Sequence, residues 1–155
     1  MKKIIYPGSF DPVTLGHIDI VARGSQLFDK VYVCMGINTN KSYFFHKEKR
    51  LELLKLSFER FSNVEIVAFE GLTVDLCKRL DCHTILRGIR TTFDLEYEKA
   101  IADSNKKLFP EIETILLMSD YKVSGVSSTI VRELIRNQAD LTAFLPKEIL
   151  GNLKD

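Results

Sequence analysis

Three short segments of the sequence are rich in side chains that bind phosphate. They are YPGSFDPVTLGH at residues 6–17, LRGIR at residues 86–90 and VSGVSSTIVREL at residues 123–134. The first ends on His17, the second contributes Arg87 and Arg90, and the third contributes a run of serine and threonine hydroxyls. Imidazole, guanidinium and hydroxyl groups all donate hydrogen bonds to phosphate oxygens, and a guanidinium can hold two oxygens at once. These residue types indicate the binding or transfer of phosphate groups.

The three segments contain no obvious general base or nucleophile. This composition suits a reaction that moves phosphate groups by positioning and charge stabilisation. A phosphate monoester has its second pKa near 6, so at neutral pH it is mostly dianionic and attacks without help from a base. The sequence also lacks the Gly-x-x-x-x-Gly-Lys-Ser/Thr loop, which argues against a P-loop kinase.

The elements that position these segments alternate along the chain. Short apolar runs predict five strands, at residues 2–6, 30–37, 63–69, 83–88 and 112–118. Helical spacing of apolar residues predicts helices from residue 16 and at residues 47–61, 72–80, 92–108, 129–137 and 145–153. Such alternation predicts an α/β fold, a doubly wound sheet of five parallel strands with helices on both faces.

In a sheet of this kind, ligands bind beyond the carboxyl ends of the strands, where the strand order reverses. The loops that should share this edge are those after Tyr6, Ile37, Phe69, Leu86 and Met118. Two of them lead into helix N-termini, whose unpaired N–H groups attract anions. Lys41, in the polar break after the second strand, is placed to reach across as a mobile charge.

Each of these features also has a simpler interpretation. His17 could be a solvated residue at the start of a helix, after a well-made turn. The two arginines could form ordinary salt bridges, for instance to Asp94 or Glu98. One of the serines before the last long helix could serve only as its N-cap, and Lys41 could simply be solvated. Local sequence leaves these alternatives open, and the convergence of all the segments on one edge favours the phosphate site.

Bulk properties narrow the class of protein. The 155 residues predict one domain over residues 1–155, and 22 basic against 21 acidic residues give a net charge of +1, with no global attraction to nucleic acid or an anionic membrane. The three cysteines show no zinc-like spacing and indicate reduced thiols in the cytosol. Pro7 interrupts the first apolar stretch, so no secretory signal is expected, and no run reaches transmembrane length.

Several stretches resemble a known group of enzymes. TLGH at residues 14–17, RGIR at 87–90 and VSSTIVR at 126–132 resemble the signatures of the nucleotidyltransferase superfamily. YPGSFDPVTLGHIDIV at residues 6–21, RGIRTTFDLEYE at 87–98 and the chain length resemble the bacterial phosphopantetheine adenylyltransferase family along nearly the whole chain. The resemblance implies a Rossmann-like fold, a cytoplasmic homohexamer, and transfer of AMP from ATP to 4′-phosphopantetheine. The products would be dephospho-coenzyme A and pyrophosphate, in the penultimate step of coenzyme A biosynthesis.

The resemblance also implies roles for individual residues. The catalytic group would be His17, Lys41, Ser9 and Arg90. His17 would donate to the α-phosphate, while Ser9 and Lys41 would orient the attacking phosphate. ATP would be bound by Gly8, Ser9, His17, Gly88, Arg90, Glu98, Ser127, Ser128 and Thr129. 4′-Phosphopantetheine would be bound by Ser9, Lys41, Leu72, Thr73, Arg87, Ile101 and Asn105. Mg²⁺ would be held mainly by the ATP phosphates, with no metal ligand from the protein, and dephospho-coenzyme A and coenzyme A would bind as product or feedback ligands.

The chain departs from the family pattern at three positions. Ser9 stands where many members have threonine, and Ser119 and Val123 stand where members often have proline and tryptophan. Ser119 and Val123 lie where the resemblance implies contacts to adenine. Three alternatives stay open: a glycerol phosphate cytidylyltransferase, a nicotinamide mononucleotide adenylyltransferase, and a silent nucleotide-binding sensor. The segment RGIRTTFDLEYE argues against the first two, and His17 together with Lys41 argues against the third.

Overall fold

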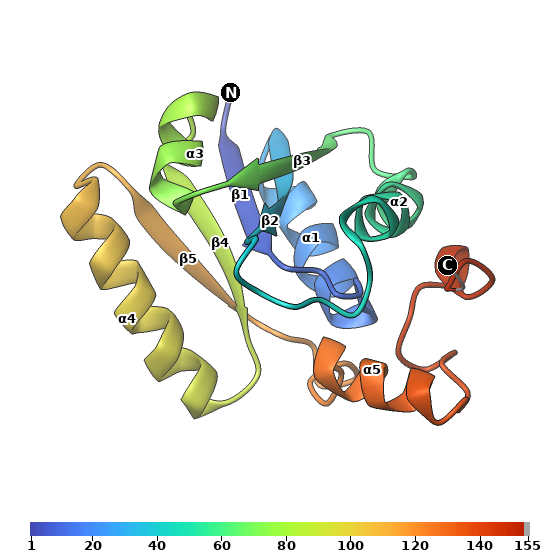
Figure 1. The fold of residues 1–155 in the computed structure, drawn as a ribbon. Helices are drawn as coiled ribbons and strands as arrows, with labels where there is room; N and C mark the ends of the chain where they lie inside the picture. Colours follow the sequence, from blue (N-terminus) through green and yellow to red (C-terminus); the bar gives the residue numbers. More distant parts are fainter. Residues whose placement is uncertain (154–155) are drawn as a thin grey trace.

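The structure, a computed structural model, describes residues 1–153 and is built around one five-stranded sheet. The strands are β1 (Lys3–Gly8), β2 (Lys30–Ile37), β3 (Val64–Glu70), β4 (Thr84–Ile89) and β5 (Glu113–Met118). All neighbouring pairs are parallel, in the order β3-β2-β1-β4-β5 (Figure 1). The register places Lys3 of β1 opposite Lys30 of β2. This arrangement confirms the predicted parallel sheet of five strands.

Helices cover both faces of the sheet, as the sequence predicts for this Rossmann-like fold. They are α1 (Leu15–Leu27), α2 (Lys47–Phe58), α3 (Thr73–Leu80), α4 (Thr92–Leu108) and α5 (Ser128–Arg136). Figure 1 shows α1 and α2 on one side of the sheet and α3 and α4 on the other. Ile4 and Ile5 of β1 join different hydrophobic clusters because successive strand residues point to opposite faces.

The prediction of a helix over residues 145–153 is wrong. The segment contains only a 3-10 turn, Lys147–Ile149. Pro146 precedes this turn and Gly151 follows it, and both residue types disfavour the interior of a helix. Leu145 and Ile149 are nonetheless buried in the core. The apolar spacing of this segment therefore reflects packing of an irregular chain.

The predicted single domain over 1–155 stays a prediction, and its last two residues lie outside the described part of the chain. Within the described part, Cys34, Cys77 and Cys82 are buried free thiols, and burial raises the pKa of Cys77 to about 12. None of the helices described is long and apolar enough to cross a membrane.

Strand order reverses between β1 and β4, because the chain runs outward from β1 through β2 to β3 and then returns to β4 on the other side. Ligands bind such sheets beyond the carboxyl ends at this point. Close packing of α1 on β4 helps to form the crevice. A Cβ added to Gly88 would lie 2.9 Å from Cγ1 of Ile20, so only glycine fits at this position without a shift.

Candidate active site

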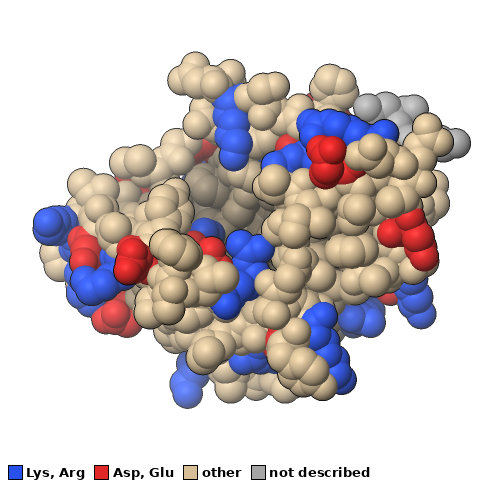
Figure 2. All heavy atoms as spheres, turned by 90° about the horizontal axis from the view of Figure 1, so that it is seen from below, with Lys and Arg blue, Asp and Glu red and all other residues tan. Residues whose placement is uncertain are grey.

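A cavity of about 640 Å³ opens at the carboxyl ends of β1 and β4. Figure 2, which views the molecule from that end, shows a hollow with Lys and Arg side chains around it. A second cavity of about 350 Å³ adjoins the first and shares part of its wall. The shared wall consists of Pro7, Gly8, Ser9, Lys41, Tyr43, Arg87 and Glu98. Residues from all three of the segments that are rich in phosphate-binding side chains line the larger cavity.

All but one of the predicted site residues line these cavities. The larger cavity is lined by Gly8, Ser9, His17, Lys41, Arg87, Gly88, Arg90, Glu98, Ser127, Ser128 and Thr129. The second is lined by Gly8, Ser9, Lys41, Thr73, Arg87, Glu98, Ile101 and Asn105. Leu72 is the exception: it is the N-cap residue of α3, more than half exposed, and belongs to neither lining.

His17 lies in the first turn of α1 and its orientation is fixed by the backbone. The N–H of Thr14, the N-cap residue, donates to Nδ1 of His17 at 2.9 Å. Nδ1 must therefore be unprotonated in the neutral ring, which places the proton on Nε2. The ring of Phe10 packs edge-on against the imidazole with 5.0 Å between centroids. His17 consequently presents one neutral N–H donor to the cavity.

The surroundings of His17 keep its imidazole uncharged. Burial, and then the positive charges of Arg87 and Arg90, lower the pKa of His17 to about 4. At neutral pH the ring is therefore a neutral hydrogen-bond donor, and the positive charge of the site comes from the arginines and from Lys41.

This shift predicts how acid affects the stability of the fold. An unfolded chain binds a proton on His17 below its ordinary pKa of about 6.5, whereas the folded chain resists protonation until the pH falls to about 4. The neutral His17 therefore contributes stability to the fold above the unfolded pKa, and this stability is lost as the pH falls from about 6.5 to about 4. We expect the thermal midpoint of the wild type to fall more between neutral pH and the lower end of the window than that of His17→Gln. Equal slopes in differential scanning calorimetry would contradict this.

Side chains from other elements hold the loop from β1 to α1 by donating hydrogen bonds to its carbonyl oxygens. The Pro7 carbonyl, at the end of β1, accepts a hydrogen bond from Arg87. In the loop itself, the carbonyls of Ser9, Asp11 and Pro12 accept from Arg50, Arg132 and the Ser128 hydroxyl. Their partial negative charges are thereby neutralised, so the loop repels an anion less than free carbonyls would. Donors from three different helices or strands hold this short loop in one shape.

The structure gives a packing reason for glycine at position 8, which the sequence did not show. The sequence suggests that glycine leaves room for a ligand. In the structure, a Cβ on Gly8 would lie 2.9 Å from Cζ of Phe10, inside normal contact distance. Phe10 is 2% exposed, has a left-handed φ of 47°, and packs against His17. Gly8 therefore makes room for the ring that orients the histidine.

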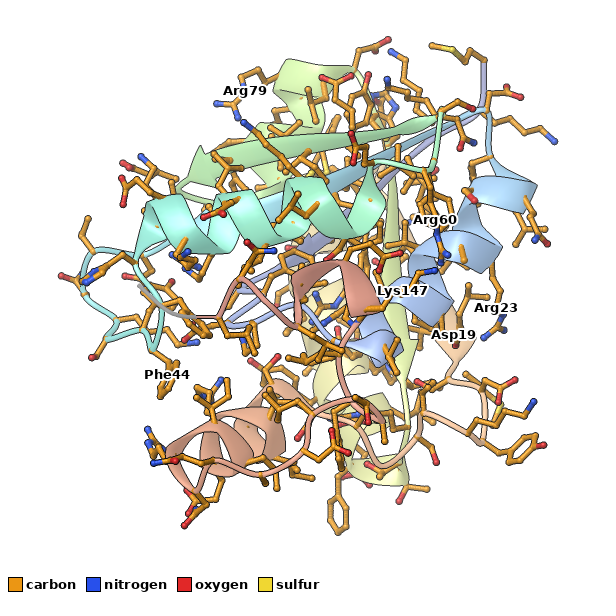
Figure 3. The ribbon with its side chains drawn as sticks, turned by 90° about the vertical axis from the view of Figure 1, so that its right-hand side faces the viewer. Asp19, Arg23, Phe44, Arg60, Arg79 and Lys147 are labelled. Carbon is orange, nitrogen blue, oxygen red and sulfur yellow. The ribbon has the colours of Figure 1, made fainter. Side chains whose placement is uncertain are left out.

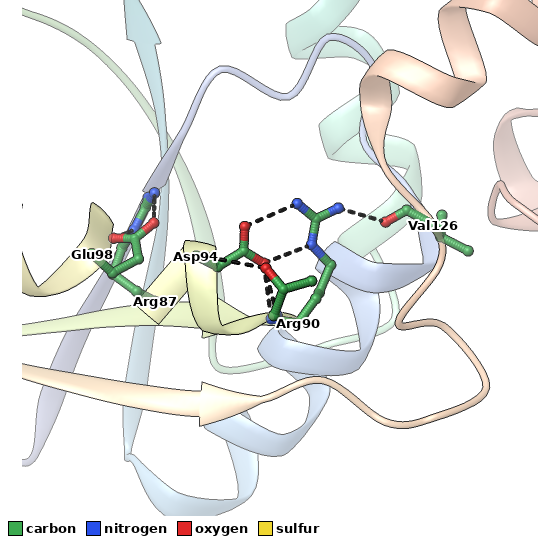
Figure 4. Close-up of polar contacts among 6 residues, drawn as sticks. Arg87, Arg90, Asp94, Glu98 and Val126 are labelled. Carbon is green, nitrogen blue, oxygen red and sulfur yellow. Dashed lines mark hydrogen bonds and ion pairs between the residues drawn. The ribbon is translucent and has the colours of Figure 1, made fainter. Parts of the chain in front are cut away.

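Two arginines, Arg87 within the end of β4 and Arg90 just after it, form salt bridges and line the cavity at the same time. Arg87 makes a bidentate pair with Glu98, with Nε–Oε2 and Nη2–Oε1 distances of 2.7 and 2.6 Å (Figure 4). Arg90 contacts Asp94 at 3.2 Å through Nε and the Val126 carbonyl at 3.3 Å through Nη1. Both salt bridges considered from the sequence are present. The pairs hold each guanidinium in place rather than removing it from the cavity.

The hydroxyls at the start of α5 have separate structural roles. Ser127 is the N-cap, and its Oγ accepts from the Ile130 N–H at 3.2 Å. Ser128 Oγ donates to the Pro12 carbonyl at 2.7 Å, and Thr129 Oγ1 accepts from Arg132 at 3.1 Å. N-capping thus explains one hydroxyl, while another joins α5 to the loop before α1. The first turn of α5 and its positive dipole end are held against the cavity.

Lys41 and Ser9 meet across the shared wall. Lys41 Nζ lies 3.4 Å from Ser9 Oγ and 5.5 Å from the centroid of the Tyr43 ring. Lys41 is exposed, whereas Ser9 is half-buried. An ammonium and a hydroxyl at this separation can both donate to one phosphate group.

Sequence reasoning missed several residues of the site. Arg132 and Arg136 line the larger cavity from α5, and their spacing of four on one helix face could have indicated this. Phe44, labelled in Figure 3, packs under Arg136, with 5.3 Å from the guanidinium carbon to the ring centroid.

Asp19 and Arg23, a salt-bridged pair on α1 that is labelled in Figure 3, hold the end of β5 and the loop after it. Arg23 donates to the carbonyl of Met118, the last residue of β5, at 2.7 Å, and Asp19 accepts from the Asp120 N–H at 3.1 Å. Ser119 lies in this loop and lines the larger cavity. These hydrogen bonds join residues about a hundred positions apart in the sequence, so no local sequence pattern predicts them.

The fold and the donors that line the larger cavity define a class of protein, the α/β nucleotidyltransferases. A family model described as cytidylyltransferase-like matches residues 5–134. A structure from Vibrio parahaemolyticus, of a protein named as a candidate nicotinate-nucleotide adenylyltransferase, superposes with a TM-score of 0.73 over 97% of this chain and 93% of that one. Its 20% sequence identity makes this a likeness of fold alone.

Relatives with higher sequence identity show which family within this class the chain belongs to. The phosphopantetheine adenylyltransferase of Flavobacterium psychrophilum is 46% identical over 96% of this chain and 98% of its own length. That of Leptospira biflexa serovar Patoc is 49% identical over 97% of this chain and 94% of its own. The chain belongs to the phosphopantetheine adenylyltransferase family.

Proposed function

We propose that this protein transfers the adenylyl group of ATP to 4′-phosphopantetheine, giving dephospho-coenzyme A and pyrophosphate. The observation that carries the proposal is the pair of adjoining cavities with Ser9 and Lys41 in their common wall. A transfer between two phosphate-bearing substrates needs two binding spaces that meet at the reacting phosphates. The family membership supports the same reaction.

The larger cavity is assigned to ATP. His17 Nε2–H donates to an α-phosphate oxygen as charge builds there, while Arg90 and the first turn of α5, with Ser128 and Thr129, hold the β- and γ-phosphates. These donors are fixed before substrate arrives, by the Thr14 N–H, Asp94 and Pro12 contacts, so little reorganisation accompanies the reaction.

The smaller cavity is assigned to 4′-phosphopantetheine. Arg87, Ser9 and Lys41 receive its phosphate, and Thr73, Ile101 and Asn105 contact the pantetheine arm beyond them. The mixture of apolar and amide-bearing side chains suits an arm that contains both methyl and amide groups. Leu72 is left outside this assignment because it lines neither cavity.

The chemical step needs no side-chain base. An oxygen of the acceptor phosphate attacks the α-phosphorus of ATP, and the bond from that phosphorus to the bridging oxygen of the β-phosphate breaks. Pyrophosphate leaves with the electron pair of that bond. The acceptor is mostly dianionic at neutral pH, so no proton has to be removed first.

Nucleotidyl transfer from ATP generally uses a divalent metal ion. Residues 1–153 contain no group of three or more His, Cys, Asp or Glu side chains placed to hold one. Asp94 and Glu98, the acidic residues in the cavity walls beyond the first loop, are each paired with an arginine. These residues fit a metal that arrives on the ATP phosphates, so we assign Mg²⁺ to the nucleotide, where it would supply positive charge to the leaving group.

Pyrophosphate release tests the proposal against its alternatives. Purified protein is given ATP with 4′-phosphopantetheine, ATP with nicotinamide mononucleotide, and CTP with glycerol phosphate. Release with the first pair alone supports the proposal. Release with another pair would overturn the substrate assignment, and binding of ATP without release from any pair would identify a sensor.

A homohexamer is part of the same proposal. Large apolar side chains are exposed at Phe93, Tyr97, Leu108, Met118 and Tyr121. Exposed apolar surface of this kind is typical of contacts between protein chains. Sedimentation equilibrium at six times the mass of one chain supports the hexamer, whereas a monomer contradicts it. Coenzyme A and dephospho-coenzyme A are expected to compete for the same two cavities.

A further inference from the structure

Arg50, in the first turn of α2, is buried although it carries a full charge. It is 1% exposed. Its polar partners within residues 1–153 are two carbonyl oxygens, those of Ser9 at 2.7 Å and Gly36 at 3.4 Å, and its Nε has none. The guanidinium carbon lies 3.8 Å from the centroid of the Tyr43 ring. Stacking and carbonyl contacts, rather than a carboxylate, hold this charge.

Stability alone does not explain an arginine here. Burying a guanidinium without a paired carboxylate costs free energy, and a methionine of similar volume fills a core position without that cost. A cation near the N-terminus of a helix also faces the positive end of the helix dipole. The contacts that Arg50 makes must therefore serve something other than packing.

The partners of Arg50 belong to the two segments that carry the Ser9–Lys41 pair. Ser9 lies in the loop after β1. Gly36 lies near the end of β2, and Tyr43 follows Lys41 in the segment after that strand. Lys41 Nζ in turn lies 3.4 Å from Ser9 Oγ. One rigid guanidinium thus contacts both sides of the wall that separates the two cavities.

A second buried charge joins the same two segments. Asp11, 6% exposed, accepts hydrogen bonds from the Phe44 and Phe45 N–H groups at 2.7 and 2.9 Å. Asp11 therefore draws amides of the later segment toward the first loop, while Arg50 draws a carbonyl of the first loop toward α2.

We propose that Arg50 is a positioning residue that sets the spacing of Lys41 Nζ and Ser9 Oγ for the acceptor phosphate. The inference rests on the proposed function and deepens it. Arg50 belongs to the lining of neither cavity, so it acts through the two segments and not by contact with a substrate. The hydrogen bonds of Arg50 go to neither His17 nor Arg90, so we expect the nucleotide side of the site to change less than the acceptor side when Arg50 is replaced.

A double-mutant cycle between Arg50 and Lys41 tests the proposal. Arg50→Met is expected to lower kcat by about 100-fold, the scale of a misplacement of about 1 Å, while the Kd for ATP changes little. In a Lys41→Met background the same substitution should have almost no further effect, because the group it positions is gone. Arg50→Lys keeps the positive charge but loses the planar stacking on Tyr43, and it should recover part of the rate. If Arg50→Met does not fold, Arg50→Lys takes its place in the cycle.

Leu54→Ala is the matched control, because Leu54 is a buried residue of the same helix with no polar contact to the wall. Its effect on kcat, measured well below the thermal midpoint, should be small and should multiply with that of Lys41→Met. If Arg50→Met also multiplies with Lys41→Met, or if the Kd for ATP rises in step with the fall in kcat, the positioning role is wrong.

Hydrogen exchange gives a readout that needs no substrate. Arg50→Met should raise exchange in residues 36–45 and leave α5 unchanged, whereas Leu54→Ala should raise it throughout α2. Unchanged exchange in residues 36–45 would overturn the inference whatever the kinetics. If the wild type releases no pyrophosphate from ATP and 4′-phosphopantetheine, the proposed function fails separately, and exchange still decides the structural role of Arg50.

Discussion

Replacement of His17 by alanine is expected to lower kcat by about 100- to 1,000-fold, while the Kd for ATP changes much less. The reason is that a prepositioned donor aimed at developing charge contributes mainly to the transition state. The Thr14 N–H and the Phe10 ring fix the imidazole before substrate binds. Steady-state pyrophosphate release gives kcat, and calorimetric titration gives the Kd.

Two comparisons make the His17 result specific. His83→Ala removes an exposed histidine next to Phe109, outside both cavities, and should leave kcat unchanged. His17→Gln offers an amide N–H donor and should retain more activity than alanine. A His17→Ala variant that keeps the wild-type kcat, or loses ATP binding and kcat equally, would remove His17 from the chemical step.

The Glu98→Gln variant is expected to lose about 3 kcal/mol of unfolding free energy, because removing one partner of a buried pair leaves the other charge uncompensated. The Glu98 side chain is 8% exposed and that of Arg87 is 25% exposed. The remaining amide oxygen can accept only part of the bidentate contact. Urea denaturation of the full chain measures the change.

An exposed pair on the same helix gives the control for Glu98. Lys99 and Asp103 lie 2.6 Å apart and are both more than half exposed, so Asp103→Asn should change stability little because water screens the pair. Similar losses for Glu98→Gln and Asp103→Asn would show that the Arg87–Glu98 pair is not special. A stable Glu98→Gln protein with a raised KM for 4′-phosphopantetheine would assign Glu98 to orienting Arg87 rather than to stability.

The sequence predicts most of the fold because its signals are local and periodic. Continuous apolar runs such as residues 30–37 are typical of strands covered on both faces, and regular alternation with helices implies parallel crossovers. Parallel strands end at one edge, so the positions of His17, Arg90 and Ser128 near one cavity follow from topology. The segment 145–153 was mispredicted because burial of Leu145 and Ile149 imitates helical spacing.

The detailed geometry of the site was beyond sequence reasoning because it depends on contacts between distant residues. The tautomer of His17 depends on one backbone N–H, and the role of Gly8 depends on where the Phe10 ring lies. Arg50 looks like one more charge on an amphipathic helix, yet it is buried against two carbonyls 14 and 41 residues away. Such pairings are set by tertiary packing, which periodicity does not encode.

A crystal structure with a non-hydrolysable ATP analogue and 4′-phosphopantetheine shows whether the two substrates meet at the Ser9–Lys41 wall. We expect the triphosphate in the larger cavity, between His17 Nε2, Arg90 and the start of α5. We expect the acceptor phosphate on Ser9 and Lys41, in line with the α-phosphorus and the leaving pyrophosphate. Nucleotide and acceptor bound in cavities that do not meet at the Ser9–Lys41 wall, or a His17 ring turned away from the α-phosphate, would contradict this expectation.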